Sequence, residues 1–413
     1  MVTVGTVCKR RCWHPIYGLF LGCGALFIIK EIIQLHKTVE EKIIENVARQ
    51  TFPLSEANGG TVDEEAAKSP GEIQQTRIET LRKVCQVNSL NKDLVISELW
   101  KGFFFVDQEL KVVYCGVPKV GCTFLKRLFY VLSGKSRSKN PYDISANAAH
   151  GLPLETFQTH NDSEIAYFIE HYKKVLFVRE PIKRLISGYN DKIRAINPGY
   201  WSGLGRRIIK TVRRNYSEIS ERCGHDVSFQ EFLDHRIYEE IGQSKPDMHW
   251  DTVYRTCHPC MIKYDFIGKM ESFNDDVNLF LHQINARKDI VLHEDYTSKL
   301  DNILIEVQNF YDRVNKSAEC GLTFEEIVKR YWEVLFHKNL ITPPTTLPNI
   351  QKTTTKEELT EIMIDLYHRQ KATKTLTNKS FDVLKSVSKA TIAKLQDFYK
   401  YDFEMFGYNK TEI

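Results

Sequence analysis

Two segments of the chain combine a short apolar run with an amphipathic stretch that follows it closely. In the first, residues 112–117 form an apolar run of strand length, and a loop bounded by Gly116 and Gly121 follows. Apolar residues then recur at helical spacing from Phe124 to Leu132. The pattern predicts a buried strand of a parallel sheet, a loop that a ligand can approach closely, and an amphipathic helix.

The second segment repeats this order between Val175 and Tyr189. Val175 to Val178 is continuously apolar, Arg179 follows at the carboxyl end, and Pro181 suits the first turn of a helix. Apolar residues then recur at i, i+3, i+4 and i+7. The two segments predict an α/β fold with a central parallel sheet flanked by helices. Ligands are expected at the carboxyl ends of its strands.

The first loop has the chemistry of an anion site, because free N–H groups and the helix dipole converge where the helix begins. It is not a Walker A loop: Cys122 occupies the position of the usual lysine, and the lysine lies inside the loop as Lys119. Thr123 retains the hydroxyl. The loop therefore suits a phosphate but lacks the usual arrangement for a magnesium-bound triphosphate.

The second segment carries a further set of anion-binding groups. The guanidinium of Arg179 can donate two N–H groups to one phosphate. Lys183 and Arg184 add positive charge on the following helix, and Ser187 adds a hydroxyl. The alternative is a buried arginine paired with Glu180 or another carboxylate. Two phosphate sites on parallel strands would suit a nucleotide that carries phosphates at both ends.

Several motifs resemble those of the Golgi carbohydrate sulfotransferases. The 5′-phosphosulfate loop of that family is similar to PKVGCTFLKR, and its 3′-phosphate motif is similar to REPIKRLISGY. Further blocks resemble residues 249–271 (HWDTVYRTCHPCMIKYDFIGKME), 205–215 (GRRIIKTVRRN) and 399–408 (YKYDFEMFGY). The nearest group contains the chondroitin and dermatan 4-O-, HNK-1 and GalNAc 4-O-sulfotransferases. This chain departs from the pattern with Gly121, where members carry Ala, and with Phe124-Leu125, where Asn-Trp is common.

The resemblance implies a P-loop-like sulfotransferase fold and 3′-phosphoadenosine 5′-phosphosulfate as the donor, with no metal. It implies that Lys119 stabilises the leaving group. The two motifs contribute these donor-binding residues: Pro118, Lys119, Val120, Gly121, Cys122, Thr123, Phe124, Arg179, Glu180, Pro181, Ile182, Lys183, Arg184, Leu185, Ile186 and Ser187. His150 is the first candidate for the base, because a related sulfotransferase group carries a catalytic histidine in a similar interval. His249 is the second, and either histidine could instead be structural.

The acceptor is expected to be an acidic glycan. The first expectation is a chondroitin-type chain, to which the protein would transfer sulfate at the 4-O position of GalNAc. A basic row at helical spacings could follow the carboxylates of a uronic-acid polymer, although a solvated helix face is the alternative. The row consists of Arg206, Arg207, Lys210, Arg213 and Arg214. Two other functions remain open: a P-loop phosphotransferase, and a non-catalytic relative that binds glycans.

The formal net charge of the 413-residue chain is only +4, which does not indicate a nucleic-acid partner. Lys9 to Arg11 precede an apolar stretch, which predicts a type II anchor in the Golgi membrane. A cleaved signal peptide is the alternative. The expected organisation is a cytosolic tail (1–12), a signal-anchor transmembrane segment (13–29), a partly disordered lumenal stem (30–80) and a lumenal catalytic domain (81–413). A short amphipathic helix in the stem could support a homodimer.

Sequons and cysteines agree with a lumenal domain. Five N-x-[ST] sequons predict glycosylation at Asn161, Asn215, Asn315, Asn378 and Asn409. Seven of the ten cysteines follow the anchor, and in an oxidising lumen most should pair. Cys122 is expected to remain a free thiol. For Cys257 and Cys260, disulfides to other loops are preferred over a zinc site, because a single C-x-x-C lacks a second pair of ligands.

Overall fold

The computed structural model describes residues 69–90, 98–242, 246–286, 290, 295–342, 346–371, 383–385 and 387–410. The predicted tail and anchor, and the stem up to residue 68, lie outside these ranges. Within the described ranges, no helix combines the length and apolar character needed to cross a bilayer.

The fold contains a mixed five-stranded sheet in the order β3-β1-β2-β4-β5. Its strands are β1 (Phe104–Asp107), β2 (Val112–Cys115), β3 (Glu155–Thr156), β4 (Lys173–Val178) and β5 (Phe266–Lys269). The predicted parallel sheet is confirmed for β2, β4 and β5. Strands β1 and β3 extend it with antiparallel pairs. A short turn joins β1 to β2, and such a turn permits only the antiparallel arrangement.

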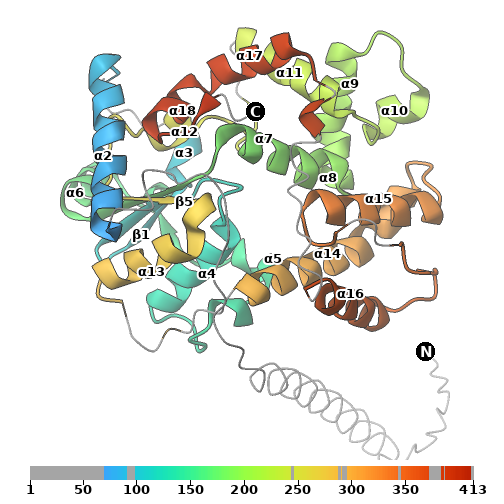
Figure 1. Cartoon of the computed structure of the whole chain (residues 1–413), viewed down its shortest axis with the longest axis horizontal. Coiled ribbons are helices and arrows are strands. Elements are labelled where there is room, and N and C mark those ends of the chain that lie inside the picture. The colour runs from blue at the N-terminus through green and yellow to red at the C-terminus, as the bar shows by residue number, and fades with distance from the viewer. Residues whose placement is uncertain are drawn as a thin grey trace, which may run out of the picture. The chain divides into compact units, whose positions relative to one another are not determined.

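Helices flank the sheet and form a second region towards the C-terminus (Figure 1). Those before β5 are α2 (Pro70–Val87), α3 (Glu98–Lys101), α4 (Cys122–Leu132), α5 (Ala146–Ala149), α6 (Asp162–His171), α7 (Pro181–Tyr189), α8 (Pro198–Tyr200), α9 (Arg206–Val212), α10 (Glu218–Cys223), α11 (Phe229–Ile241) and α12 (Val253–Cys257). Those after it are α13 (Phe273–Gln283), α14 (Asp295–Ala318), α15 (Phe324–His337), α16 (Lys356–Lys371), α17 (Lys389–Phe398) and α18 (Lys400–Met405). Two π-helices, η4 (Asn190–Arg194) and η5 (Trp201–Gly205), interrupt the middle of the chain.

Helix α2 begins inside the segment predicted as stem, so the folded domain starts before residue 81. A capping box between Ser69 and Glu72 fixes the start of the helix. Arg77 on its buried face pairs with Asp276 at 2.8 Å and donates to the carbonyl of Ile267 in β5 at 3.0 Å. The helix is therefore attached to α13 by a buried ion pair and to the edge strand β5 by a hydrogen bond.

Buried apolar residues form three clusters. One surrounds the sheet and includes the inner faces of α4 and α13. The second joins α7, α9, α11, α17 and α18, and the third joins α14, α15 and α16. Helices α17 and α18 pack against the first two clusters, and the chain divides between them at Tyr399, whose hydroxyl donates to the carbonyl of Trp250.

Three disulfides connect elements that are distant in sequence. Cys115 at the end of β2 pairs with Cys257, and Cys85 of α2 pairs with Cys260. Cys223 pairs with Cys320. The preference for disulfides over zinc at the C-x-x-C motif is therefore confirmed. Cys122 is a free thiol, as expected.

The Cys115–Cys257 disulfide should make a measurable contribution to stability, because it closes a loop of 142 residues. Replacing both cysteines with serine should lower the free energy of unfolding by about 2–4 kcal/mol, measured by urea titration. Cys122→Ser, which breaks no disulfide, is the control and should leave the urea midpoint nearly unchanged. An unchanged midpoint in the double variant would contradict this pairing.

Candidate functional site

The first loop lies between β2 and α4, and glycine is required at both of its ends. A Cβ at Gly116 would lie 2.5 Å from the ring of Phe105. Gly121 has a φ of +78°, and a Cβ there would lie 2.7 Å from the ring of Phe273. Lys119 also has a positive φ, of +70°. The loop thus adopts a tight conformation that brings its backbone close to whatever binds it.

The start of α4 is suited to an anion. Gly121 is its N-cap residue and makes no side-chain cap. The first amides of an α-helix have no partner inside the helix, and an anion can therefore accept from them. Cys122, Thr123 and Phe124 form the first turn and are only partly buried. The residues present therefore fit the predicted 5′-phosphate.

The second motif meets the first in space. Arg179 follows β4 directly, and its Nη1 donates to the carbonyl oxygen of Lys119 at 3.3 Å. Burial lowers the pKa of Arg179, and the nearby carboxylate of Glu271 opposes this effect. Because β2 and β4 are parallel neighbours, their two loops lie at the same edge of the sheet, as the sequence predicts.

Helix α7 has the predicted start. Glu180 is its N-cap residue and accepts from the amides of Ile182 and Lys183, while Pro181 occupies the first turn. The burial of Glu180 is therefore explained by its role as the cap of α7, and it does not require Glu180 to neutralise Arg179. Four donor-motif residues face the core and are buried: Pro181, Ile182, Leu185 and Ile186. Lys183 and Ser187 lie one turn apart on α7 and are partly accessible.

Arg184 has a different environment from the one that the motif suggests. Its side chain is 1% exposed and donates to three backbone carbonyls. Nε reaches Pro118 at 3.0 Å, and Nη1 reaches Asp251 at 2.6 Å. Nη2 reaches Met248 at 3.1 Å. The guanidinium therefore joins the first loop to the segment that carries His249, rather than presenting its donors to solvent.

Lys119 forms an ion pair with Asp191, a residue that sequence reasoning did not identify. The distance from Nζ to Oδ2 is 3.0 Å. Asp191 lies on η4, directly after the second motif. Burial lowers the pKa of Lys119, and Asp191 opposes that effect.

His249 has the environment of a histidine held in one tautomer. Its Nδ1 lies 2.6 Å from Oδ1 of Asp247 and 3.2 Å from the hydroxyl of Tyr200. Its backbone packs on α7, where a Cβ at Gly188 would lie 3.2 Å from the His249 carbonyl oxygen. A hydrogen bond from Nδ1–H to the carboxylate leaves Nε2 with its lone pair. Burial lowers the pKa of His249 despite Asp247, so the ring is neutral near pH 7.

His150 follows the short helix α5 and is exposed. Burial of part of its ring lowers its pKa, and the charges of Lys126 and Lys192 add to that effect. The electrostatic effect of His249 also lowers the pKa of His150. The two histidine candidates, although 99 positions apart, are thus brought within electrostatic range of each other.

The predicted basic row does not form one continuous helical face, because α9 ends at Val212. Arg213 leaves the helix and pairs with Asp226 at 2.7 Å and with Glu231 at 2.6 Å. Lys210 pairs with Glu221 at 2.9 Å, and Arg206 donates to the carbonyl of that residue. Three of the five cations therefore hold neighbouring elements together. The exposed members of the row are Arg207, Lys210 and Arg214.

The sequon asparagines that the structure describes are all exposed: Asn161, Asn215, Asn315 and Asn409. Asn378 lies outside the described residues. The Oδ1 of Asn161 accepts from the amide of Glu164 to cap α6. Glycosylation at these positions stays a prediction.

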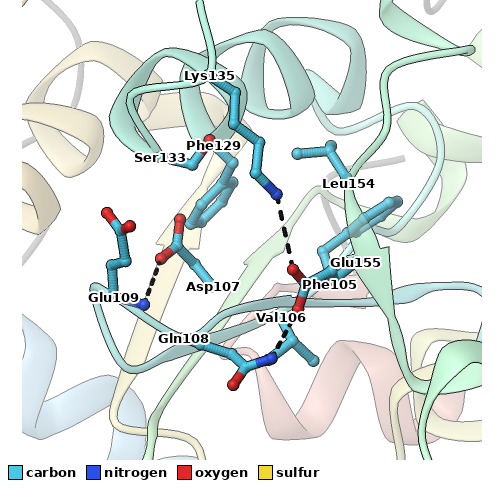
Figure 2. Close-up of a pocket in the computed structure, with 10 residues that line it drawn as sticks. All are labelled: Phe105, Val106, Asp107, Gln108, Glu109, Phe129, Ser133, Lys135, Leu154 and Glu155. Atoms are coloured by element: carbon cyan, nitrogen blue, oxygen red, sulfur yellow. Dashed lines mark hydrogen bonds and ion pairs between the residues drawn. The ribbon is translucent and has the colours of Figure 1, made fainter.

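A pocket lies beside β1, β3 and the end of α4 (Figure 2). Asp107, Glu109 and Glu155 contribute carboxylates to its rim, and Lys135 lies 3.7 Å from Glu155. None of the predicted site residues lines it. Among the described residues, no group of three or more His, Cys, Asp or Glu side chains is arranged to hold a metal ion. The expectation of metal-free chemistry stays a prediction.

The structure is an α/β fold in which the loop after β2 and the motif after β4 lie at the carboxyl ends of two parallel strands of a mixed sheet. A model of the sulfotransferase family matches residues 103–331, more than half of the chain. The chain belongs to this family.

Its relatives are carbohydrate sulfotransferases. Carbohydrate sulfotransferase 14 of Danio rerio is 33% identical over 286 residues, which cover 68% of this chain and 75% of that protein. Carbohydrate sulfotransferase 11 of Rattus norvegicus is 37% identical over 214 residues (51% of this chain, 61% of that protein). Carbohydrate sulfotransferase 8 of Homo sapiens is 36% identical over 221 residues (52% of this chain, 51% of that protein). The chain thus spans between half and two thirds of these last two relatives. No solved structure matches it.

The role of Arg184 can be tested by removing its donors. Arg184→Met removes the donor to three backbone carbonyls, of which those of Pro118 and Asp251 belong to buried residues, and each buried carbonyl left without a partner should cost about 1–3 kcal/mol. The free energy of unfolding should fall by roughly 3 kcal/mol or more in a urea titration. Arg207→Met changes an exposed arginine on α9 and should stay within about 0.5 kcal/mol of the wild type. Equal stability of the two variants would contradict the tie between the loop and the His249 segment.

Proposed function

We propose that this protein is a carbohydrate O-sulfotransferase that uses 3′-phosphoadenosine 5′-phosphosulfate as its donor. The observation that supports the proposal best is the meeting of the two motifs, where Arg179 donates to the carbonyl of Lys119. Their loops leave parallel strands at one edge of the sheet, which suits a nucleotide that carries phosphates at both ends. The family of the chain and the names of its relatives point the same way.

The donor supplies an activated sulfuryl group, which the loop and its neighbours must hold and make reactive. The first-turn amides of α4 and the Thr123 hydroxyl would bind the 5′-phosphate. Arg179 and Ser187 would hold the 3′-phosphate through a guanidinium fork and a hydroxyl. Lys119 would stabilise the charge that develops on the 5′-phosphate as its bond to sulfur breaks. Arg184 would act indirectly, because it donates to the carbonyl of Pro118 and so holds the donor loop in position.

The geometry favours His249 over His150 as the base. Asp247 fixes the Nδ1–H tautomer of His249, so that Nε2 can take the proton of a sugar hydroxyl. A carboxylate that orients a histidine in this way also stabilises the imidazolium that forms. His150 is more exposed than His249, and the charges of Lys126 and Lys192 add to the effect of burial in lowering its pKa. It would then contribute to binding the acceptor.

The acceptor is proposed to be a glycosaminoglycan or another glycan, with the 4-O position of chondroitin-type GalNAc as the first choice. That choice rests on the resemblance of the motifs to the 4-O-sulfotransferase group. Arg207, Lys210 and Arg214 are the exposed cations on the α9 side that an acidic chain could contact. A Golgi location, with the domain in the lumen, is part of the proposal and agrees with three disulfides.

Sulfate transfer is the direct test of this function. The protein would be incubated with donor labelled in the sulfuryl group and with chondroitin, dermatan, desulfated heparin, or oligosaccharides that end in GalNAc or glucuronate. Label should enter chondroitin most strongly, and disaccharide mapping should place it at the 4-O position of GalNAc. Tight binding of adenosine 3′,5′-bisphosphate without transfer to any acceptor would indicate a non-catalytic relative. Absence of both would contradict the donor site.

The base is tested by comparing two glutamine variants. His249→Gln should lower kcat by about 10²-fold or more, because a positioned general base typically contributes 10²–10⁴-fold. The affinity for adenosine 3′,5′-bisphosphate, measured by calorimetry, should stay close to that of the wild type. His150→Gln is the matched variant and should mainly raise the KM for the acceptor. The reverse pattern would assign the base to His150.

A further inference from the structure

Five charged side chains meet beside the donor loop, and we call them the Asp191 cluster: Lys119, Asp191, Lys192, Glu306 and Lys338. Oδ2 of Asp191 lies 3.0 Å from Nζ of Lys119 and 3.2 Å from Nζ of Lys192. Its Oδ1 lies 3.0 Å from Nζ of Lys338, which also reaches Glu306 at 2.6 Å. Three ammonium groups thus face two carboxylates, which leaves one positive charge in excess.

The cluster joins three parts of the fold. Lys119 comes from the donor loop, and Asp191 and Lys192 come from η4, which continues α7. Lys338 caps the end of α15, and Glu306 lies on α14. A π-helix is a rare element that often marks a functional site. Here it places Asp191 directly beyond the second phosphate motif, where its carboxylate reaches the lysine of the first.

The cluster is largely shielded from water, so its charges act strongly on one another. The side chains of Lys119, Lys192 and Lys338 are 19–20% exposed, and that of Asp191 is 24% exposed. Burial alone would raise the pKa of Asp191, but its three lysine partners hold it well below the usual value. Asp191 is therefore fully ionised at neutral pH.

Lys119 depends on this carboxylate for its charge. Burial lowers the pKa of Lys119, and Lys338 and Lys192 lower it further, whereas Asp191 raises it. Within the cluster, Glu306 pairs with Lys338. The titratable groups that act on the cluster from neighbouring segments are His249, which is neutral near pH 7, His150, Asp247 and Tyr200, whose ring lies under the Lys192 ammonium. Without Asp191, three lysines would share one site with Glu306 as the nearest remaining carboxylate.

We propose that Asp191 is a positioning residue that holds the Lys119 ammonium beside the donor loop and keeps it protonated. A neutral lysine could not stabilise a leaving phosphate. Through Lys338, helices α14 and α15 take part in the same arrangement, although neither carries a donor motif. The inference rests on the proposed function, because it concerns the lysine that the proposed transfer requires.

The test is Asp191→Asn, which keeps the size of the side chain and removes its charge. Because one pKa unit corresponds to 1.36 kcal/mol, loss of a contact ion pair should move the alkaline limb of the kcat–pH profile down by about one pH unit or more. The affinity for adenosine 3′,5′-bisphosphate should change by less than about threefold, since the phosphate ligands remain. Asp191→Glu should restore much of the alkaline limb. An alkaline limb in Asp191→Asn that matches the wild type would overturn the proposal.

Asp301→Asn is the matched control. It breaks an ion pair of 2.8 Å with the buried Arg127 on α4, outside the cluster. It should lower stability without moving the alkaline limb. A shift as large as that of Asp191→Asn would mean that general destabilisation, rather than the charge of Lys119, moves the profile, and would overturn the proposal.

A second readout does not depend on turnover. Lysines would be acetylated with acetic anhydride over a pH series, and mass spectrometry would give the half-reaction pH of Lys119. That pH should fall by about one unit in Asp191→Asn. If the wild type transfers no sulfate but the shift occurs, the proposed function fails while the role of Asp191 stands. If transfer is confirmed and the half-reaction pH is unchanged, the role of Asp191 fails alone.

Discussion

The site depends on one buried guanidinium, that of Arg184, which connects segments that are far apart in sequence. It donates to the carbonyl of Pro118 in the donor loop and to those of Met248 and Asp251 on either side of His249. Burial of the charge lowers the pKa of Arg184, but arginine stays protonated in proteins, and it has three carbonyl partners to offset the loss of water. The relative position of the loop lysine and the histidine is thus set by a side chain that need not touch a ligand.

The Cys115–Cys257 disulfide and the cap that Asp402 provides for α12 also hold the donor loop and the segment after His249 in position. Cys115, one residue before the loop, is bonded to Cys257, and the carboxylate of Asp402 accepts from the amides of Val253 and Tyr254 at the start of α12. Burial raises the pKa of Asp402 to about 6. The segment after His249 is therefore held by the sheet, by α18 and by Arg184 together. A preorganised site of this kind loses little free energy to reorganisation when charge develops during transfer.

The sequence predicts the strands, loops and helices around both motifs, because their apolar runs, glycines and Pro181 are local signals. It also predicts that Cys122 is free and that most of the other cysteines after the expected anchor form disulfides. The roles of Arg184, Asp191 and Asp247 could not be predicted from local signals of this kind. Arg184 looks like a phosphate ligand in the motif, and only the packing of residues 248–251 against α7 shows why it is buried.

Asp191 and Lys338 are 147 positions apart, and no local pattern indicates that they meet. The only signal near Asp191 is its place two residues after Tyr189, where the second motif ends. Asp247 has a clearer signal in the sequence, because a carboxylate two residues before a candidate base could orient the imidazole ring of that base. The basic row shows the opposite case, because its spacing suggests one helical face. Carboxylates on α10 and α11 and in the loop between them pair with Lys210 and Arg213, and the backbone carbonyl of Glu221 accepts from Arg206.

The central claim is that the two motifs bind the two phosphate ends of one nucleotide. The most direct measurement is an experimental structure of the protein with adenosine 3′,5′-bisphosphate. We expect the 5′-phosphate at the amides of residues 121–123 beside Lys119, and the 3′-phosphate at Arg179 and Ser187. A nucleotide bound elsewhere, or one whose 3′-phosphate contacts neither Arg179 nor Ser187, would contradict that claim.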